Sequence, residues 1–219
     1  MQINNCILTL ITDRPVVDSP TTLRGFIAGK FRNNPFLHNH SEKGFIYTYP
    51  KIQYKIIDKI PMILGIGEVS EFVEEILIIE YLNLKNKQYT VIDKKLLREN
   101  NSFGVINGML SYKFLTPWLA LDEESFNRYK KRNSGERKKQ LESILIGNII
   151  SMAKGLEYVI TDKIIAKVDV YEVHTSLKGT PMLGFVGTFS VNFEIPDYWG
   201  LGKSVSRGFG TVIKIGSVK

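Results

Sequence analysis

Two of the three histidines in the chain, His38 and His40, lie two residues apart in a polar segment after the first predicted helix. Two imidazoles can share proton transfer near neutral pH, one as general base and the other as general acid. RNA carries its own nucleophile, because a ribose 2′-hydroxyl that loses its proton can attack the adjacent phosphate. The acid then protonates the departing 5′-oxygen. A pair of histidines can therefore cut RNA without a metal ion or a bound water.

Lys30 and Tyr47 are candidates to complete such a site. On a helical wheel, Lys30 falls within an apolar stripe formed by Leu23, Phe26, Ile27 and Phe31. Its amine could reach past the helix end and stabilise the charge of a phosphorane, or its stem could pack on the core while the amine reaches water. Tyr47 could orient a histidine or contact the phosphate, and the alternative for it is a cross-strand aromatic position.

Carboxylates are scarce around these residues. Between Asp18 and Asp58 the only acidic residue is Glu42. The basic residues over the same interval are Arg24, Lys30, Arg32, Lys43, Lys51 and Lys55. Metal-dependent nucleases hold their ions mainly with carboxylates, so this segment favours a phosphate ligand over magnesium. A zinc pair and a structural role for the histidines stay open, with Cys6 and His174 as the other strong metal ligands.

A glycine-rich segment at residues 200–210 predicts contact with a polyanion. The candidate RNA-binding residues in it are Gly200, Gly202, Lys203, Arg207, Gly208, Phe209 and Gly210. Glycines allow close approach of the backbone to a phosphate, and successive amides can surround an anion. The alternative is a tight turn before the last strand.

A basic run at residues 128–139 holds seven Lys and Arg against one Glu. The candidate RNA-binding residues in it are Lys130, Lys131 and Arg132. The run could hold an RNA backbone, or it could be the solvated face of a helix and its linker. It accounts for nearly all of the net charge of +7, which itself favours a polyanionic partner.

The composition indicates a globular chain of 219 residues with 43% hydrophobic residues. The single cysteine, Cys6, excludes an internal disulfide and suits a reducing cytoplasm, where we expect the protein. The N-terminus lacks a basic region followed by a long apolar run, so no signal peptide is expected. Apolar runs such as 60–66 are too short to span a membrane.

The pattern of residues predicts an α+β protein. Strands are expected at 3–12, 45–56, 60–66, 105–115, 163–173, 182–195 and 211–215, with a strand or hairpin around 77–92. Helices are expected from Ser19-Pro20 to about Asn33, and at 69–76, 122–129 and 137–155. Each half approximates strand, helix, strand, strand, helix, strand, the ferredoxin-like order of RNA-recognition domains. We predict two tandem ferredoxin-like domains: 1–95, with the histidine segment, and 96–219, with the glycine-rich segment.

Three stretches resemble the Cas-six endoribonucleases of CRISPR systems, especially the b-type. They are residues 23–30 with 36–40 (FLHNH), residues 49–55 (YPKIQYK) with 61–66 (PMILGI), and residues 200–202 (GLG) with 207–210 (RGFG). The resemblance implies tandem ferredoxin-like domains and metal-independent cutting of CRISPR repeats, which leaves a 2′,3′-cyclic phosphate and a 5′-hydroxyl. It also implies that His38, His40, Lys30 and Tyr47 act together and that residues 200–210 contact RNA.

The partners expected from this resemblance are CRISPR repeat RNA, other proteins of a CRISPR effector complex and a second copy of the chain. No cofactor is expected. The alternative function is that of a repeat-binding subunit that does not cleave, which would rest on the basic run and the glycine-rich segment alone.

Overall fold

The computed structural model describes residues 1–32, 34 and 49–216. The chain forms two units, which we call the N-terminal and the C-terminal unit. The N-terminal unit comprises Gln2–Asn101 and Val205–Gly208. The C-terminal unit comprises Met1, Ser102–Ser204 and Phe209–Lys219. A short piece of the glycine-rich segment therefore packs with the first hundred residues rather than with its own sequence neighbours.

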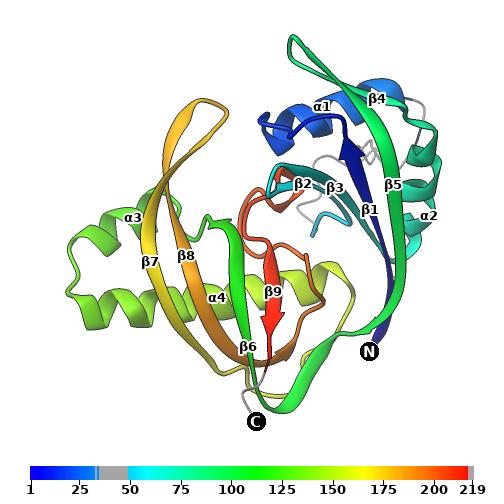
Figure 1. Cartoon of the computed structure of the whole chain (residues 1–219). Helices are drawn as coiled ribbons and strands as arrows, with labels where there is room; N and C mark the ends of the chain where they lie inside the picture. Colours follow the sequence, from blue (N-terminus) through cyan, green and yellow to red (C-terminus); the bar gives the residue numbers. More distant parts are fainter. Residues whose placement is uncertain (33, 35–48, 217–219) are drawn as a thin grey trace. The chain divides into compact units, whose positions relative to one another are not determined.

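The N-terminal unit contains a five-stranded sheet with the order β2-β3-β1-β5-β4 (Figure 1). Its strands are β1 (Gln2–Thr12), β2 (Ile52–Ile57), β3 (Ile60–Ile66), β4 (Tyr81–Leu84) and β5 (Lys87–Ser102). Its helices are α1 (Pro20–Lys30) and α2 (Ser70–Glu75), and the 3-10 turns η2 (Gly67–Val69) and η3 (Ile76–Ile78) flank α2. Both helices share one buried core with β1, to which Leu8, Leu23 and Phe72 contribute.

The start of α1 follows from local chemistry. Ser19 is the N-cap, and its hydroxyl accepts a hydrogen bond from the Thr22 N–H at 3.4 Å. Pro20 occupies the first turn, where its missing N–H costs nothing. The helix ends at Lys30, which is earlier than the predicted end near Asn33, and the Phe31 N–H makes the last helical bond, to Ile27 O.

Within the described residues, the strand predicted at 45–56 begins later than expected. β2 begins at Ile52, and residues 49–51 lie outside it. Pro50 has no N–H to donate to a neighbouring strand, which explains why pairing with β3 starts only after it. Residues 45–48 lie outside the described residues.

The C-terminal unit contains a four-stranded antiparallel sheet with the order β7-β8-β6-β9. Its elements are β6 (Gly104–Trp118), α3 (Glu123–Lys130), α4 (Ser134–Gly155), β7 (Ala166–Leu177), β8 (Thr180–Glu194) and β9 (Val212–Ile215). Figure 1 shows α4 crossing one face of these strands. Its buried residues include Leu145 and Ile149, which cover that face.

The helices and strands of the second half follow in the order predicted one by one, but this order differs from the approximate strand, helix, strand, strand, helix, strand repeat. Both helices, α3 and α4, lie between the first and second strands of this unit. Between β8 and β9 the structure has only the 3-10 turn η4 (Val205–Arg207) in place of a second crossover helix. The glycine-rich sequence explains the difference, because glycine is a poor helix former.

The α+β prediction of ferredoxin-like units is confirmed. In both sheets the third strand lies between the first and the second, and the last strand flanks the first on its other side. The N-terminal unit adds β4 as an extra edge strand. Within the described ranges, no helix combines the length and the apolar character needed to cross a membrane.

Candidate functional site

Of the four predicted catalytic residues, the structure describes Lys30; His38, His40 and Tyr47 lie outside the described residues. Leu23 and Ile27 of α1 are buried as predicted, whereas Lys30 is exposed and does not belong to the buried stripe. Its Nζ lies 4.8 Å from the centroid of the Tyr81 ring. An aromatic face attracts the ammonium without neutralising it, so the charge of Lys30 faces the surface at the end of α1.

The glycine-rich segment is held by close packing. Gly202, Gly208 and Gly210 all have positive φ, at 87°, 82° and 63°. A Cβ on Gly210 would overlap the carbonyl oxygen of Leu201. The Gly208 N–H donates to Val205 O, and the Gly210 N–H donates to Pro117 O. The turn alternative therefore accounts for these glycines, and contact of this segment with RNA would depend mainly on its side chains.

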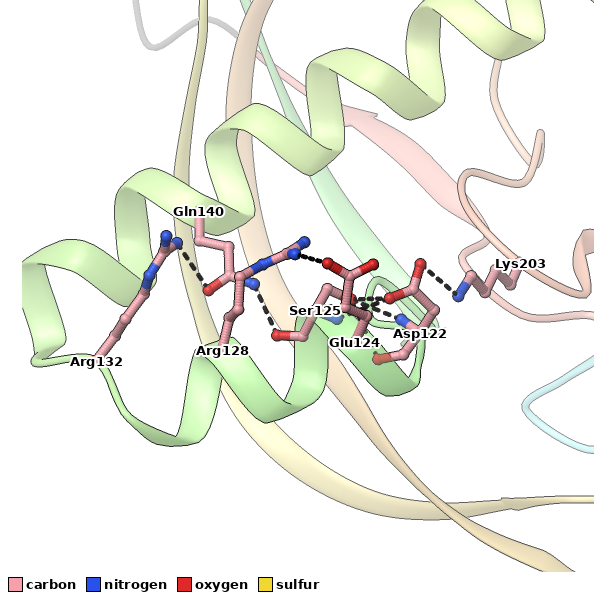
Figure 2. A network of polar contacts seen from close by, with 7 residues as sticks. All are labelled: Asp122, Glu124, Ser125, Arg128, Arg132, Gln140 and Lys203. Atoms are coloured by element: carbon pink, nitrogen blue, oxygen red, sulfur yellow. Dashed lines mark hydrogen bonds and ion pairs between the residues drawn. The ribbon is translucent and has the colours of Figure 1, made fainter.

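Lys203 belongs to a polar network at the start of α3 (Figure 2). Its Nζ lies 3.8 Å from Oδ2 of Asp122, the residue that caps α3. The Asp122 carboxylate accepts hydrogen bonds from the hydroxyl and the N–H of Ser125, which hold the pKa of Asp122 below its usual value. One of the two cations predicted to bind RNA in the glycine-rich segment is thus next to an acid.

The basic run is divided between structural and exposed cations. Its only acid, Glu136, forms a capping box with Asn133 at the start of α4. The Arg132 guanidinium donates to Gln140, and Gln140 in turn donates to the backbone of Ser125, as Figure 2 shows. These contacts join α3 to α4.

The lysines of the run lie on the surface. Lys130 places its Nζ 4.6 Å from the centroid of the Phe126 ring, and Lys131 is exposed in the turn between the helices. Beside them is a groove of about 680 Å³. Its lining includes Arg132, Arg137, Lys138, Tyr171 and Glu172. The run therefore presents cations at a concave surface, where a charged backbone could lie.

Two models of known protein families together match nearly the whole chain. The Cas6b N-terminal domain matches residues 1–102, and the Cas6b C-terminal domain matches residues 104–215. The chain belongs to the Cas6b family. The resemblance drawn from the three sequence stretches is confirmed.

Solved Cas6b structures share the fold closely. A crystal structure of Cas6b is 36% identical, with a TM-score of 0.89, and the match covers 98% of this chain and 100% of that one. A crystal structure of the CRISPR RNA processing endoribonuclease Cas6b is 34% identical, with a TM-score of 0.78 and the same coverage. An uncharacterized protein of Methanocaldococcus jannaschii is 43% identical over 143 residues, which are 65% of this chain and 97% of that protein.

This Cas6b protein also contains a buried series of side-chain hydrogen bonds that the sequence analysis did not predict. The Lys55 amine donates to Gln53 Oε1 at 2.9 Å, and Gln53 Nε2 donates to Tyr49 Oη at 2.9 Å. Gln53 and Lys55 are both fully buried on β2. Polar residues two apart in a strand usually mark a solvent face, so the pattern contained no signal of burial. Tyr49 precedes β2, and these hydrogen bonds therefore hold the residue before the strand against the strand itself.

Burial lowers the pKa of Lys55 to about 7, and this predicts a pH-dependent stability. Above that pH the folded protein releases the proton, whereas the unfolded chain retains it up to the ordinary lysine pKa. The unfolded state then binds more protons, so stability rises with pH. We expect the unfolding free energy of the wild type, relative to Lys55→Met, to be flat below about pH 7 and to rise above it by up to about 1.4 kcal/mol per pH unit.

Urea unfolding of both proteins between pH 6 and pH 9 measures this difference. The matched control is Lys95→Met, because Lys95 is exposed on β5. The difference in unfolding free energy between Lys95→Met and the wild type is expected to be independent of pH. If the difference between Lys55→Met and the wild type is also independent of pH, the pKa of Lys55 is not lowered.

Proposed function

We propose that this chain is an endoribonuclease that cuts CRISPR repeat RNA in precursor transcripts without a metal ion. The observation that carries the proposal is the match of both Cas6b domains over residues 1–102 and 104–215. A solved relative of the same fold is a CRISPR RNA processing endoribonuclease, at 34% identity over 98% of this chain.

The proposed reaction uses the ribose 2′-hydroxyl as the nucleophile. One of His38 and His40 removes its proton, and the 2′-oxygen forms a bond to the adjacent phosphorus. The bond from phosphorus to the 5′-oxygen breaks, and the other histidine protonates that oxygen. The products are a 2′,3′-cyclic phosphate and a 5′-hydroxyl. Lys30 stabilises the additional negative charge of the phosphorane, and Tyr47 orients a histidine or the phosphate.

The described part of the site supports this assignment. Lys30 is exposed at the end of α1, and no carboxylate forms an ion pair with it among the residues that the structure describes. An ammonium that is not neutralised can act on a phosphate that approaches the segment after the helix. In this proposal the N-terminal domain carries the cutting site.

Residues beyond the first hundred would supply much of the RNA contact. We propose that Lys203, Arg207 and Phe209 of the glycine-rich segment and Lys130, Lys131 and Arg132 of the basic run bind the RNA. Gly200, Gly202, Gly208 and Gly210 shape the first of these surfaces. Other CRISPR effector proteins and a second copy of the chain are further proposed partners.

The test uses 5′-labelled repeat RNA from the CRISPR array of the host, incubated with the purified protein in EDTA. A parallel series carries a single 2′-deoxy sugar at successive positions. We expect one discrete cut in EDTA, which one deoxy substitution abolishes because it removes the nucleophile. Loss of the cut in EDTA would indicate a metal-dependent nuclease. Tight binding without any cut would indicate a repeat-binding subunit.

A further inference from the structure

The turn η4 places two residues of the glycine-rich segment against the N-terminal unit. Gly208 follows this turn with a φ of +82°, and a Cβ there would lie 2.7 Å from Pro20 Cγ and 3.0 Å from Tyr54 O. Only glycine fits so close to α1 and β2 in this conformation. Ser206 and Arg207, which directly precede Gly208, are thereby held beside α1.

Arg24 on α1 meets this turn. Its Nη1 donates to Ser206 Oγ at 3.4 Å, across 182 positions of sequence. Arg24 and Arg207 are both half-buried. Burial and then the positive charge of Arg24 lower the pKa of Arg207 below its usual value. The structure therefore brings together two guanidinium groups that repel each other.

No carboxylate compensates these two charges within the described ranges. Four other arginines of the chain each have an acidic partner. They are Arg14 with Asp13, Arg98 with Glu74, Arg128 with Glu124, and Arg137 with Glu172. Arg24 and Arg207 form no such ion pair with any of the residues that the structure describes. Two like charges partly removed from water destabilise the free protein unless an anion binds between them.

We propose that Arg24 and Arg207 together bind a single phosphate group of the RNA backbone, with the Ser206 hydroxyl as an additional donor. The planar fork of a guanidinium matches two phosphate oxygens, which suits arginine to this role better than lysine. The inference rests on the proposed function for its ligand. It adds Arg24, on α1 and outside the glycine-rich segment, to the residues that bind RNA.

The first experiment uses inorganic phosphate as the probe. The melting temperatures of the wild type, Arg24→Gln and Arg207→Gln are compared in phosphate and in chloride at equal ionic strength. Phosphate is expected to stabilise the wild type more than either variant, because binding to the folded state shifts the equilibrium. Arg128→Gln is the matched control, because its guanidinium pairs with Glu124, and it should keep the wild-type response. In chloride both test variants should melt no lower than the wild type.

The second experiment locates the phosphate. The substrates are a series of repeat RNAs, each with a 2′-deoxy sugar at the cut position to prevent cleavage. Each RNA of the series carries a single uncharged methylphosphonate at a different position. The affinity of each RNA is measured for the wild type and for each variant. One position should weaken wild-type binding about tenfold and leave both variants unaffected. The slope of log affinity against log salt should fall by about 0.7 in each single variant and no further in the double variant.

The outcomes separate this inference from the proposed function. The proposal of a shared phosphate would be overturned if the two variants lost their response to methylphosphonates at two different positions. It would also be overturned if the methylphosphonates weakened RNA binding of both variants as much as that of the wild type. Wild-type RNA affinity in both variants would also overturn it, even if the RNA is cut normally. A phosphate response that needs both arginines, in a protein that neither binds nor cuts repeat RNA, would keep the anion site and reject the proposed function.

Discussion

Replacing both His38 and His40 with alanine is expected to slow cleavage of repeat RNA by about 10²- to 10⁴-fold, the usual contribution of general acid–base catalysis. RNA affinity should stay within about twofold of wild type, because phosphate contacts from lysine and arginine dominate binding. Single-turnover cleavage at saturating protein measures the first quantity, and filter binding to the 2′-deoxy substrate measures the second.

The third histidine of the chain provides the control. His174 is exposed on β7, in the C-terminal unit. His174→Ala should cut at the wild-type rate, which excludes a general effect of losing an imidazole. If the double variant of His38 and His40 also cuts at that rate, then these residues do not carry the chemistry. If it no longer binds RNA, the histidines serve the RNA-binding surface instead.

Gly210→Ala is expected to lower the free energy of unfolding by about 3 kcal/mol or more, as the sum of left-handed strain and overpacking. The φ of Gly210 is +63°, and its missing Cβ would overlap the backbone oxygen of Leu201. Backbone cannot rotate away as a side chain can. The shift would also disturb the hydrogen bond from Gly210 N–H to Pro117 O, at 2.9 Å. Urea unfolding measures the loss.

Gly179→Ala separates the two causes. Gly179 has a φ of +85° in the turn between β7 and β8, and nothing lies within 4 Å of a Cβ placed there. Only the left-handed backbone is penalised, so the expected cost is about 1 to 2 kcal/mol. Equal losses in the two variants would show that the segment around Gly210 yields to the added methyl group.

Most of the secondary structure can be predicted from the amino-acid sequence, because the signals are local. Ser19-Pro20 marked the start of α1, and the strands predicted at 3–12 and 60–66 correspond to β1 and β3. The helices predicted at 122–129 and 137–155 correspond to α3 and α4, which are set by the caps Asp122 and Asn133. Each of these features depends on residues within one or two turns of each other.

The sequence also indicated the family. The three stretches that resemble b-type Cas-six proteins led to the family that the whole-chain match confirms. The scarcity of acids between Asp18 and Asp58, where Glu42 is the only one, predicts a surface for phosphate. Composition over a short interval is a local property, and it is therefore readable without the fold. The catalytic roles of His38 and His40 stay predictions.

Which cations have an acidic partner depends on contacts that form only in the folded chain. Arginine and lysine look alike along the sequence, but the fold pairs Arg128 and Arg137 with carboxylates and leaves Arg24 and Arg207 unpaired by acids among the described residues. It also buries Lys55 completely on β2.

The position of the last segment in the fold also depends on tertiary contacts. The glycine-rich segment expected before the final strand contains the turn η4, and the fold places Val205–Gly208 in the N-terminal unit. The close approach of Gly208 to Pro20, which leaves no room for a Cβ, involves residues far apart in sequence. Hydrophobic periodicity and capping report only on near neighbours, so contacts of this kind become visible only once the chain has folded.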